Sequence, residues 1–155
     1  MEIRMAKPED IPGLIDLLLQ VGEVHHKIRP DLFRAGAQKY DEKALTEILK
    51  DPNRPIFAAV EDGTLLGYCF CILEITRDNP VLMDQKSLYI DDLCVDENAR
   101  GKHVGARLYD FAMDYARKIG CDSLTLNVWC GNDSAMKFYE SRGLKQRNIH
   151  MEARL

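Results

Sequence analysis

The sequence has no long apolar run and no cluster of charge of one sign. No apolar segment approaches the roughly 18 residues that cross a bilayer, and Met1-Glu2-Ile3-Arg4 lacks the apolar core of a secretion signal. The net charge is −4, and Lys and Arg form no block outside one short turn. Such a charge pattern carries no electrostatic footprint for nucleic acid or an anionic membrane. We therefore expect a soluble, cytoplasmic protein that binds neither.

Cysteine pairs and metal-ligand spacings are also lacking. The five cysteines are odd in number, and none belongs to a Cys-x-x-Cys pair or has a His partner at zinc spacing. We expect reduced thiols packed in the core and no metal site. Cys94 lies beside the main motif of the chain, but burial would raise the pKa of its thiol and make it unreactive.

Strand and helix patterns alternate along the chain without repeats or low-complexity linkers. Helical spacing of apolar residues predicts helices from Pro8 to about Val21 and over residues 40–50, 104–119 and 132–141. Strand patterns fall at Ile3 to Met5 and over residues 55–60, 65–76, 86–95, 123–129 and 144–155. Asp62-Gly63 suits the positive φ angles of a tight turn, so residues 55–60 and 65–76 form an antiparallel pair.

This order of elements predicts an α/β fold in a single domain over residues 1–155. Antiparallel strands followed by strand, helix, strand, helix and strand make a mixed, mostly antiparallel sheet with helices on both faces. A doubly wound dinucleotide fold fits less well. It requires a glycine-rich turn after the first strand, where this chain has Pro8 and an acidic helix start.

The segment from Leu93 to Leu108 is the most informative about function. It runs from an apolar strand through a turn containing Gly101 into an amphipathic helix. At such a junction the first helical N–H groups have no intrahelical partner, and the positive end of the helix dipole points to the same place. The segment therefore predicts a binding site for a phosphate or pyrophosphate.

Arg100-Gly101-Lys102-His103-Val104-Gly105 resembles the Arg/Gln-x-x-Gly-x-Gly/Ala signature of the Gcn5-related N-acetyltransferases, which binds the pyrophosphate of acetyl-CoA. The resemblance continues through Asn132-x-x-Ala135 and Phe138-Tyr139-Glu140-x-x-Gly143-Leu144, and covers the chain from about Ile3 to Leu144. It implies the fold of that family, with the sheet splayed near the strand that ends at Val95.

His103 departs from the signature, because the family usually has its first loop glycine there. A positive φ at this position would strain the backbone of a non-glycine residue. A helical backbone tolerates any residue, and the N–H group is unchanged by the substitution. We therefore expect cofactor binding to survive, with the imidazole directed outward or, when protonated, against a phosphate oxygen.

The resemblance assigns the strand end at residues 93–95 to the pantetheine arm of acetyl-CoA, which would pair with free main-chain groups as an extra strand does. Asn132 could bind the cofactor or serve equally well as the N-cap of a helix. Phe138 is expected either to pack in the core or to contact the cofactor. The full set of expected cofactor-binding residues is Leu93, Cys94, Val95, Arg100, Gly101, Lys102, His103, Val104, Gly105, Ala106, Asn127, Asn132, Ala135 and Phe138.

Tyr139 matches the tyrosine that protonates the departing CoA thiolate in many family members; the alternative is a packed aromatic. An attacking amine must also lose a proton, so a carboxylate is needed as base. Asp92 is preferred over Asp91, and Glu74 is a third option. Because successive strand residues face opposite sides, we expect only one of the two aspartates to face a given cleft. For each of the three acids, the alternative is that the side chain is solvated and takes no part in catalysis.

The acceptor is expected to bind at the polar segment from His25 to Phe33, since family members select their acceptor between the first helix and the second strand. His25, His26 and Arg29, together with Glu74, are the expected substrate-binding residues for an acidic or zwitterionic molecule or a peptide terminus. A capping loop is the alternative. A metal site at the two histidines is not expected, because neighbours on a helix project about 100° apart.

The sequence thus predicts an acetyl-CoA-dependent N-acetyltransferase. It would move the acetyl group directly, in a ternary complex, to a primary amine of a small molecule or peptide. Two alternatives remain open at this point: a regulatory module that binds acyl-CoA without turnover, and a protein that binds another diphosphate in the same loop. A homodimer is compatible with the residues after Leu144.

Overall fold

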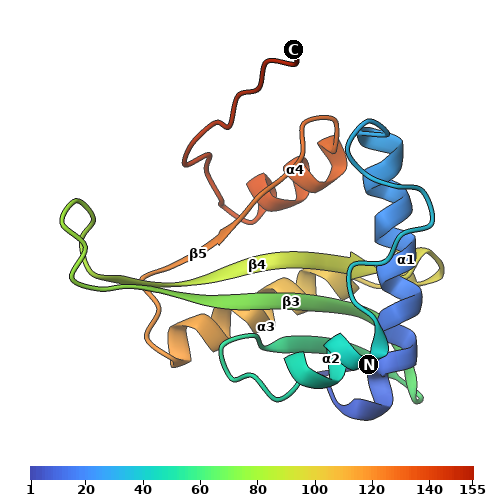
Figure 1. The fold of residues 1–155 in the computed structure, drawn as a ribbon. Helices are drawn as coiled ribbons and strands as arrows, with labels where there is room; N and C mark the ends of the chain where they lie inside the picture. Colours follow the sequence, from blue (N-terminus) through green and yellow to red (C-terminus); the bar gives the residue numbers. More distant parts are fainter.

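The computed structural model describes residues 1–155 and contains one five-stranded sheet in the order β1-β2-β3-β4-β5 (Figure 1). Its strands are β1 Glu2–Met5, β2 Ile56–Glu61, β3 Thr64–Thr76, β4 Gln85–Val95 and β5 Ser123–Leu126. The first three pairings are antiparallel, and β4 pairs with β5 in parallel. The mixed, mostly antiparallel sheet is confirmed. The turn between β2 and β3 is also as expected, since Asp62 and Gly63 have φ angles of 50° and 78°.

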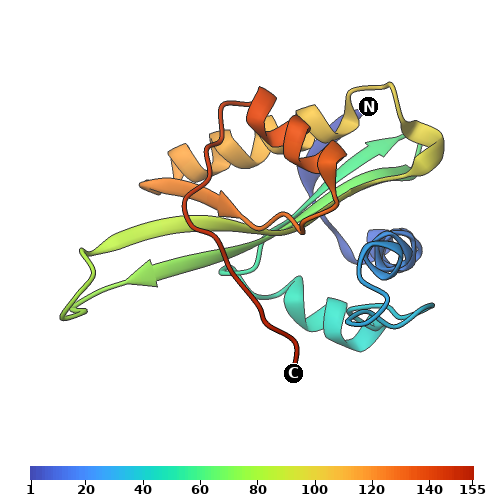
Figure 2. The ribbon, with the colours of Figure 1, turned by 90° about the horizontal axis from the view of Figure 1, so that it is seen from above.

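Helices cover both faces of this sheet, as Figure 2 shows. One face carries α1 (Ile11–Ile28), which follows the short 3-10 turn η1 (Pro8–Asp10), and α2 (Glu42–Ile48). The other face carries α3 (Val104–Lys118), preceded by the 3-10 turn η2 (Glu97–Ala99), and α4 (Asp133–Ser141). None of these helices combines the length and the apolar character of a segment that crosses a membrane. Each face has its own apolar cluster, with Leu14, Leu18, Tyr68, Phe70 and Cys94 on the α1 side and Phe57, Cys69, Leu88, Ile90 and Leu108 on the α3 side.

The largest differences from the sequence expectation concern three segments. Helix α1 continues to Ile28 instead of ending near Val21, because no proline stands between Pro12, in its first turn, and Pro30. Strand β5 ends at Leu126. Residues 144–155 contain no strand. A strand is stabilised by main-chain hydrogen bonds to the edge of a sheet, and none joins residues 145–155 to this sheet.

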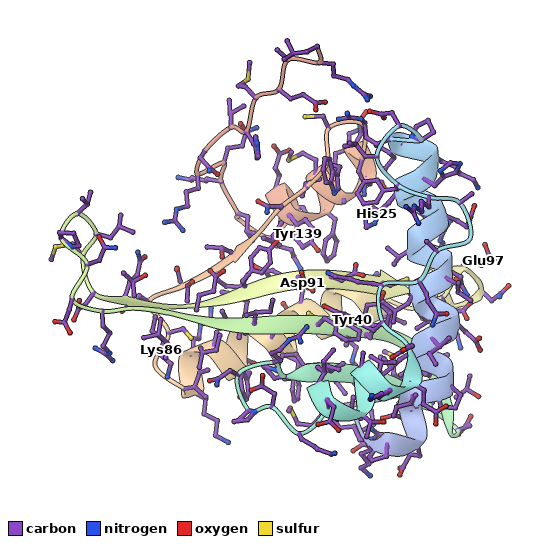
Figure 3. All side chains as sticks on the ribbon, in the orientation of Figure 1. His25, Tyr40, Lys86, Asp91, Glu97 and Tyr139 are labelled. Atoms are coloured by element: carbon purple, nitrogen blue, oxygen red, sulfur yellow. The ribbon has the colours of Figure 1, made fainter.

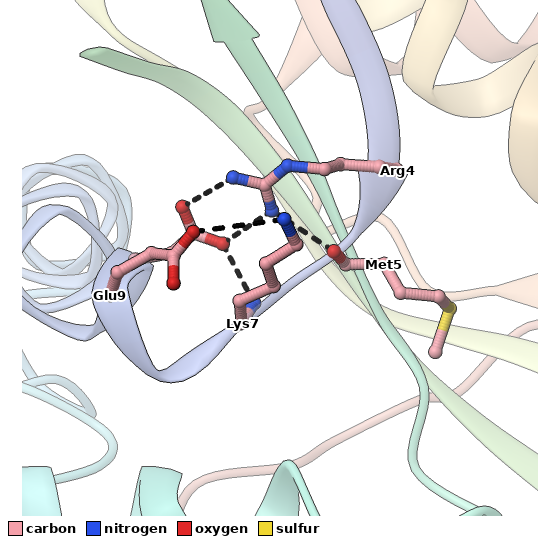
Figure 4. Close-up of polar contacts among 5 residues, drawn as sticks. Arg4, Met5, Lys7 and Glu9 are labelled. Atoms are coloured by element: carbon pink, nitrogen blue, oxygen red, sulfur yellow. Dashed lines mark hydrogen bonds and ion pairs between the residues drawn. The ribbon is translucent and has the colours of Figure 1, made fainter. Parts of the chain in front are cut away.

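The start of α1 is held to β1 by an ion pair (Figure 4). The Arg4 guanidinium donates to both carboxylate oxygens of Asp10, at 2.7 and 3.0 Å, and the Lys7 main-chain N–H donates to the same carboxylate at 2.7 Å. Asp10 is 7% exposed. Its burial disfavours the charged form, but the bonds from Arg4 and Lys7 outweigh that effect, so the pKa of Asp10 lies below its ordinary value.

Asp10→Ala is expected to lower the free energy of unfolding by about 2–4 kcal/mol, because it leaves the Arg4 guanidinium buried without its partner. The stabilisation is present above the ordinary carboxyl pKa and is lost as the pH falls through the lower pKa of the folded state. Urea unfolding should therefore separate wild type and variant near neutral pH and bring them together in acid. Glu9→Ala is the matched control, since Glu9 is exposed and its Lys7 contact of 3.7 Å contributes little. An equal loss in both variants would contradict the prediction.

Candidate active site

The sheet opens between β4 and β5. The two strands pair only from Ser87 to Ile90 on β4, against Ser123 to Leu126 on β5. Residues 91–95 of β4 still pair with β3 through Asp92 to Val95, but have no neighbour on their other edge. The expected splay near Val95 is confirmed. Main-chain groups along such an open edge are free to bind an extended ligand.

A β-bulge in β4 brings both aspartates to the α1 side of the sheet. Phe70 pairs with Asp92 and Cys71 with Ile90, so Asp91 is an extra residue. Asp91 accepts a hydrogen bond from Lys39 Nζ at 2.6 Å, and Asp92 accepts one from Tyr68 Oη at 3.0 Å. The expectation that the two side chains face opposite sides was therefore wrong. The bulge breaks the alternation on which that expectation depended.

Asp92 has the environment of a general base. It is bonded to Tyr68, which is itself fully buried. Burial raises the pKa of Asp92, and the negative charge of Asp91 adds to the shift, while the Tyr68 hydrogen bond and the positive charges of His25 and Lys39 oppose it. The Asp92 carboxylate is therefore more basic than an exposed one.

Tyr139 has the environment of a proton donor. Its ring, on α4, packs against Phe138 at 5.1 Å and Tyr109 at 6.2 Å between ring centroids. Burial raises the pKa of its phenol, and the nearby Cys69 and Asp92 add to the shift, so the hydroxyl stays protonated at neutral pH. Figure 3 shows Tyr139 above Asp91 in the view, with His25 of α1 to one side.

The loop before α3 presents free main-chain donors. The N–H groups of Val104, Gly105 and Ala106 begin the helix, and neither they nor the N–H of His103 donate to any protein carbonyl. Gly101 has a φ of 83° with open space where a Cβ would stand. Free donors at the positive end of a 15-residue helix fit a diphosphate.

His103 has a left-handed backbone, with φ 58° and ψ 24°, and not the helical backbone that would tolerate any residue. This conformation costs a non-glycine residue about 1 kcal/mol, although His adopts it more readily than most. The glycine of the family signature meets that backbone requirement without cost. The N–H group of His103 nevertheless remains free, as the sequence analysis required.

The other side chains of the loop and strand end have defined positions. Lys102 Nζ bonds Glu61 Oε2 at 2.7 Å, and Arg100 is exposed. Cys94 lies under α1, with its sulfur 3.6 Å from the Leu17 carbonyl, and burial raises the pKa of its thiol to about 12. A Cβ on Gly105 would lie 3.4 Å from the Val95 side chain, so the main chain of α3 comes close to the open edge of β4 here.

Four further expected cofactor residues lie on or before α4. Asn132 is the N-cap of α4 and accepts from the Ala135 N–H at 3.3 Å, so the capping interpretation is confirmed. Asn127 donates to Tyr89 Oη at 3.1 Å, just beyond the end of β5. Phe138 packs between Tyr139 and the Arg142 guanidinium.

The segment from His25 to Phe33 satisfies its own polar groups, as the capping-loop alternative requires. His26 Nδ1 lies 2.7 Å from the Phe33 carbonyl, and the His25 ring packs on the Phe33 ring at 5.1 Å. Arg29 bonds Asp31 at 2.7 Å and Glu152 at 2.6 Å. Hydrogen bonds from Arg29 lower the pKa of Asp31 to about 2. Arg29 is thus already paired, which leaves it poorly suited to an acidic ligand.

Glu74 is not brought to the two aspartates. It is exposed on β3, opposite Ser87 of β4, and contacts the Ser87 hydroxyl at 3.4 Å. Ser87 lies four positions before Asp91, a distance of about 13 Å along a strand.

Sequence reasoning missed Tyr68, Lys39 and Tyr40. The position of Tyr68 in an apolar strand sequence could have indicated its contact with an acid, because a buried hydroxyl needs a hydrogen-bond partner and a nearby carboxylate can supply it. Lys39 and Tyr40 lie in the loop between α1 and α2, and no local pattern indicated that this loop returns to β4.

Comparison with known proteins agrees with this geometry. Residues 22–144 match the model of the acetyltransferase (GNAT) family. The uncharacterized N-acetyltransferase YhfO of Bacillus subtilis is 32% identical over 149 residues, which cover 94% of this chain and 91% of that protein.

Two solved structures have the same fold. A mutant of the BH1408 protein from Bacillus halodurans superposes with a TM-score of 0.94 at 29% identity, covering 100% of this chain and 99% of that one. An aminoglycoside N-acetyltransferase in complex with CoA superposes with a TM-score of 0.71 at 17% identity, covering 99% of this chain and 100% of that one. From the family match and the YhfO relative together, the chain belongs to the acetyltransferase (GNAT) family and is an N-acetyltransferase.

Proposed function

We propose that this N-acetyltransferase moves the acetyl group of acetyl-CoA directly to a primary amine of a small molecule or peptide. The observation that carries the proposal is the pair formed by Asp92 and Tyr139. A carboxylate of raised pKa and a phenol held protonated are neighbours beside the open edge of β4, since the negative charge of Asp92 contributes to the raised pKa of Tyr139. The CoA complex of the similarly folded aminoglycoside enzyme supports the choice of donor.

The donor would be held mainly by main-chain groups. The free N–H groups of residues 103–106 would bind the pyrophosphate, and the open edge of β4 at residues 93–95 would pair with the pantetheine amides. Arg100 and His103 are exposed beside these donors, and the Arg100 guanidinium adds a positive charge. The thioester would then lie near the end of β4 that carries Asp92.

Asp92 and Tyr139 would then carry out the proton transfers of the reaction. Asp92 accepts a proton from the acceptor ammonium, and the neutral nitrogen forms a bond to the acetyl carbonyl carbon. As the carbon–sulfur bond breaks, Tyr139 donates its proton to the sulfur, so CoA leaves as a thiol, and the second proton lost by the nitrogen restores the Tyr139 phenol. Each proton transfer of this kind contributes about 10²–10⁴-fold to the rate. No covalent acetyl-enzyme is needed.

Tyr68→Phe is expected to shift the acidic limb of the kcat/KM profile to higher pH. The Tyr68 hydrogen bond favours the charged form of Asp92, so its loss raises the pKa of that carboxyl further. The base acts only when it is deprotonated. On acidification, the variant should therefore lose activity at a higher pH than wild type does. Tyr115→Phe, whose ring packs on Phe57 at 5.1 Å on the α3 side of the sheet, is the control and should leave the profile unchanged. Superimposable profiles for Tyr68→Phe and wild type would remove Asp92 from the role of base.

The function itself is tested by free-thiol release from acetyl-CoA with a panel of primary amines. We expect at least one amine to accelerate thiol release well above the rate with water alone. A chain that is stabilised by acetyl-CoA in thermal unfolding, yet releases no thiol with any amine, would be a binding module instead. Equal stabilisation by ADP or NAD would assign the loop to another diphosphate.

A further inference from the structure

The acceptor side of the candidate site contains an ammonium group that belongs to the chain itself. Lys39 Nζ lies 2.6 Å from Asp91 Oδ2 and 5.5 Å from the centroid of the Tyr40 ring. Its partner Asp91 is only 16% exposed, whereas the Lys39 side chain is 45% exposed. The carboxylate and the ring thus form two walls around a cation, an arrangement that binds ammonium groups in general.

Asp91 and Tyr40 are held in place independently of Lys39. The Tyr40 hydroxyl accepts from the Arg54 guanidinium at 2.8 Å and donates to Asp91 at 3.4 Å, and the Tyr40 ring stacks on Phe70 at 5.7 Å. Removing the Lys39 ammonium would therefore leave the Asp91 carboxylate and the Tyr40 ring in place.

Charge balance favours another cation whenever Lys39 leaves. Lys39 is the cation paired with Asp91, whereas the Arg54 guanidinium bonds the Tyr40 hydroxyl. Departure of Lys39 leaves a net negative charge on a largely buried carboxylate, which is costly unless a second cation replaces it. An ammonium group of a ligand would restore the balance without any other change.

Lys39 is also easily displaced. It lies in the loop between α1 and α2, outside any helix or strand, and its long flexible side chain is half exposed. Because solvent reaches the Lys39 ammonium, a ligand with its own ammonium group can approach the same carboxylate and replace Lys39 there.

Resting on the proposed function, we infer that Asp91 and the Tyr40 ring bind a second, non-reacting ammonium of the acceptor, and that Lys39 occupies this position in the free protein. The acceptor class is then an amine with two ammonium groups, such as a linear diamine or a basic amino acid. One group is held at Asp91 while the other is deprotonated by the adjacent Asp92. Acidic acceptors are disfavoured, since Lys39 and Arg29 are both already ion-paired.

The test compares a linear diamine with the monoamine of the same chain length. Asp91→Asn is expected to raise KM for the diamine about tenfold, with little change for the monoamine, because the second ammonium loses its charged hydrogen-bond partner. Lys39→Met should lower KM for the diamine, because the competing ammonium is gone. Lys43→Met, on the exposed side of α2, is the control and should change neither. Equal effects of Asp91→Asn on both amines would overturn the inference while leaving the acetyltransferase proposal intact.

A calorimetric titration of the diamine into the CoA-loaded protein separates this inference from the proposed function. It needs no turnover, so it reports on the ammonium site even if thiol release fails with every amine. Binding to wild type that weakens about tenfold in Asp91→Asn supports the inference. Binding of equal strength in both proteins, or no binding to wild type, overturns it.

Discussion

Replacing Tyr139 by Phe is expected to lower kcat by about 10²–10³-fold while leaving the affinity for acetyl-CoA within about twofold. The phenol is the only group we assign to protonate the departing sulfur, and without it the thiolate leaves with its full charge. The Phe ring keeps the packing on Phe138 and Tyr109, so the fold and the cofactor loop should be unchanged. Steady-state thiol release gives kcat, and calorimetry with acetyl-CoA gives Kd.

Tyr109→Phe is the matched control for this prediction. Tyr109 lies in the same aromatic cluster and is 4% exposed, but we assign its hydroxyl no part in the reaction. Its variant should retain kcat within about threefold, as expected for removal of a hydroxyl that takes no part in the chemistry. Full activity of Tyr139→Phe would show that Tyr139 is a packed aromatic and that water or another group protonates the sulfur.

Replacing Gly105 by Leu is expected to raise the Kd for acetyl-CoA by at least about tenfold, equivalent to about 1.4 kcal/mol. A Cβ at this position already stands 3.4 Å from the Val95 side chain and 3.8 Å from the Leu93 side chain. The remaining atoms of a leucine would therefore cover the open edge of β4, beside the free N–H groups at the start of α3. The measurement is calorimetric titration with acetyl-CoA.

Gly105→Ala distinguishes crowding from a general loss of fold. Its single methyl group makes an ordinary contact with Val95, and alanine is better suited than glycine to a helix, so the variant should be at least as stable as wild type. We expect it to bind acetyl-CoA nearly as well as wild type does. If Gly105→Leu binds equally well too, the loop before α3 does not hold the cofactor.

Much of the fold was predictable because its signals are local. The Asp62-Gly63 turn places two positive φ angles in succession, the hairpin geometry that the sequence predicted. Gly120, with a φ of 72°, ends α3 as its position after the apolar stripe indicated. Five strands and four helices follow from such patterns, and the loop before α3 presents the free donors that its motif predicted.

The features that sequence patterns did not predict depend on contacts between distant residues. The left-handed backbone of His103 is set by the path of the chain from η2 into α3. The Lys39–Asp91 ion pair joins residues 52 positions apart, through a loop that runs along α1. A Cβ on Gly22 would lie 2.5 Å from the Ala37 carbonyl oxygen, so this glycine permits the close approach of that loop.

The bulge at Asp91 also determines where the chain tolerates a change in length. Every residue of β4 after the bulge points to the face opposite to the one that uninterrupted alternation would assign, which places Cys94 under α1 and Leu93 and Val95 toward α3. Inserting one more residue beyond the bulge would exchange these two faces and expose apolar side chains, whereas deleting Asp91 would remove the bulge and leave residues 92–95 on their present faces. The hairpin loop at residues 77–84 has no such constraint, so natural insertions should be concentrated in that loop and absent from β4.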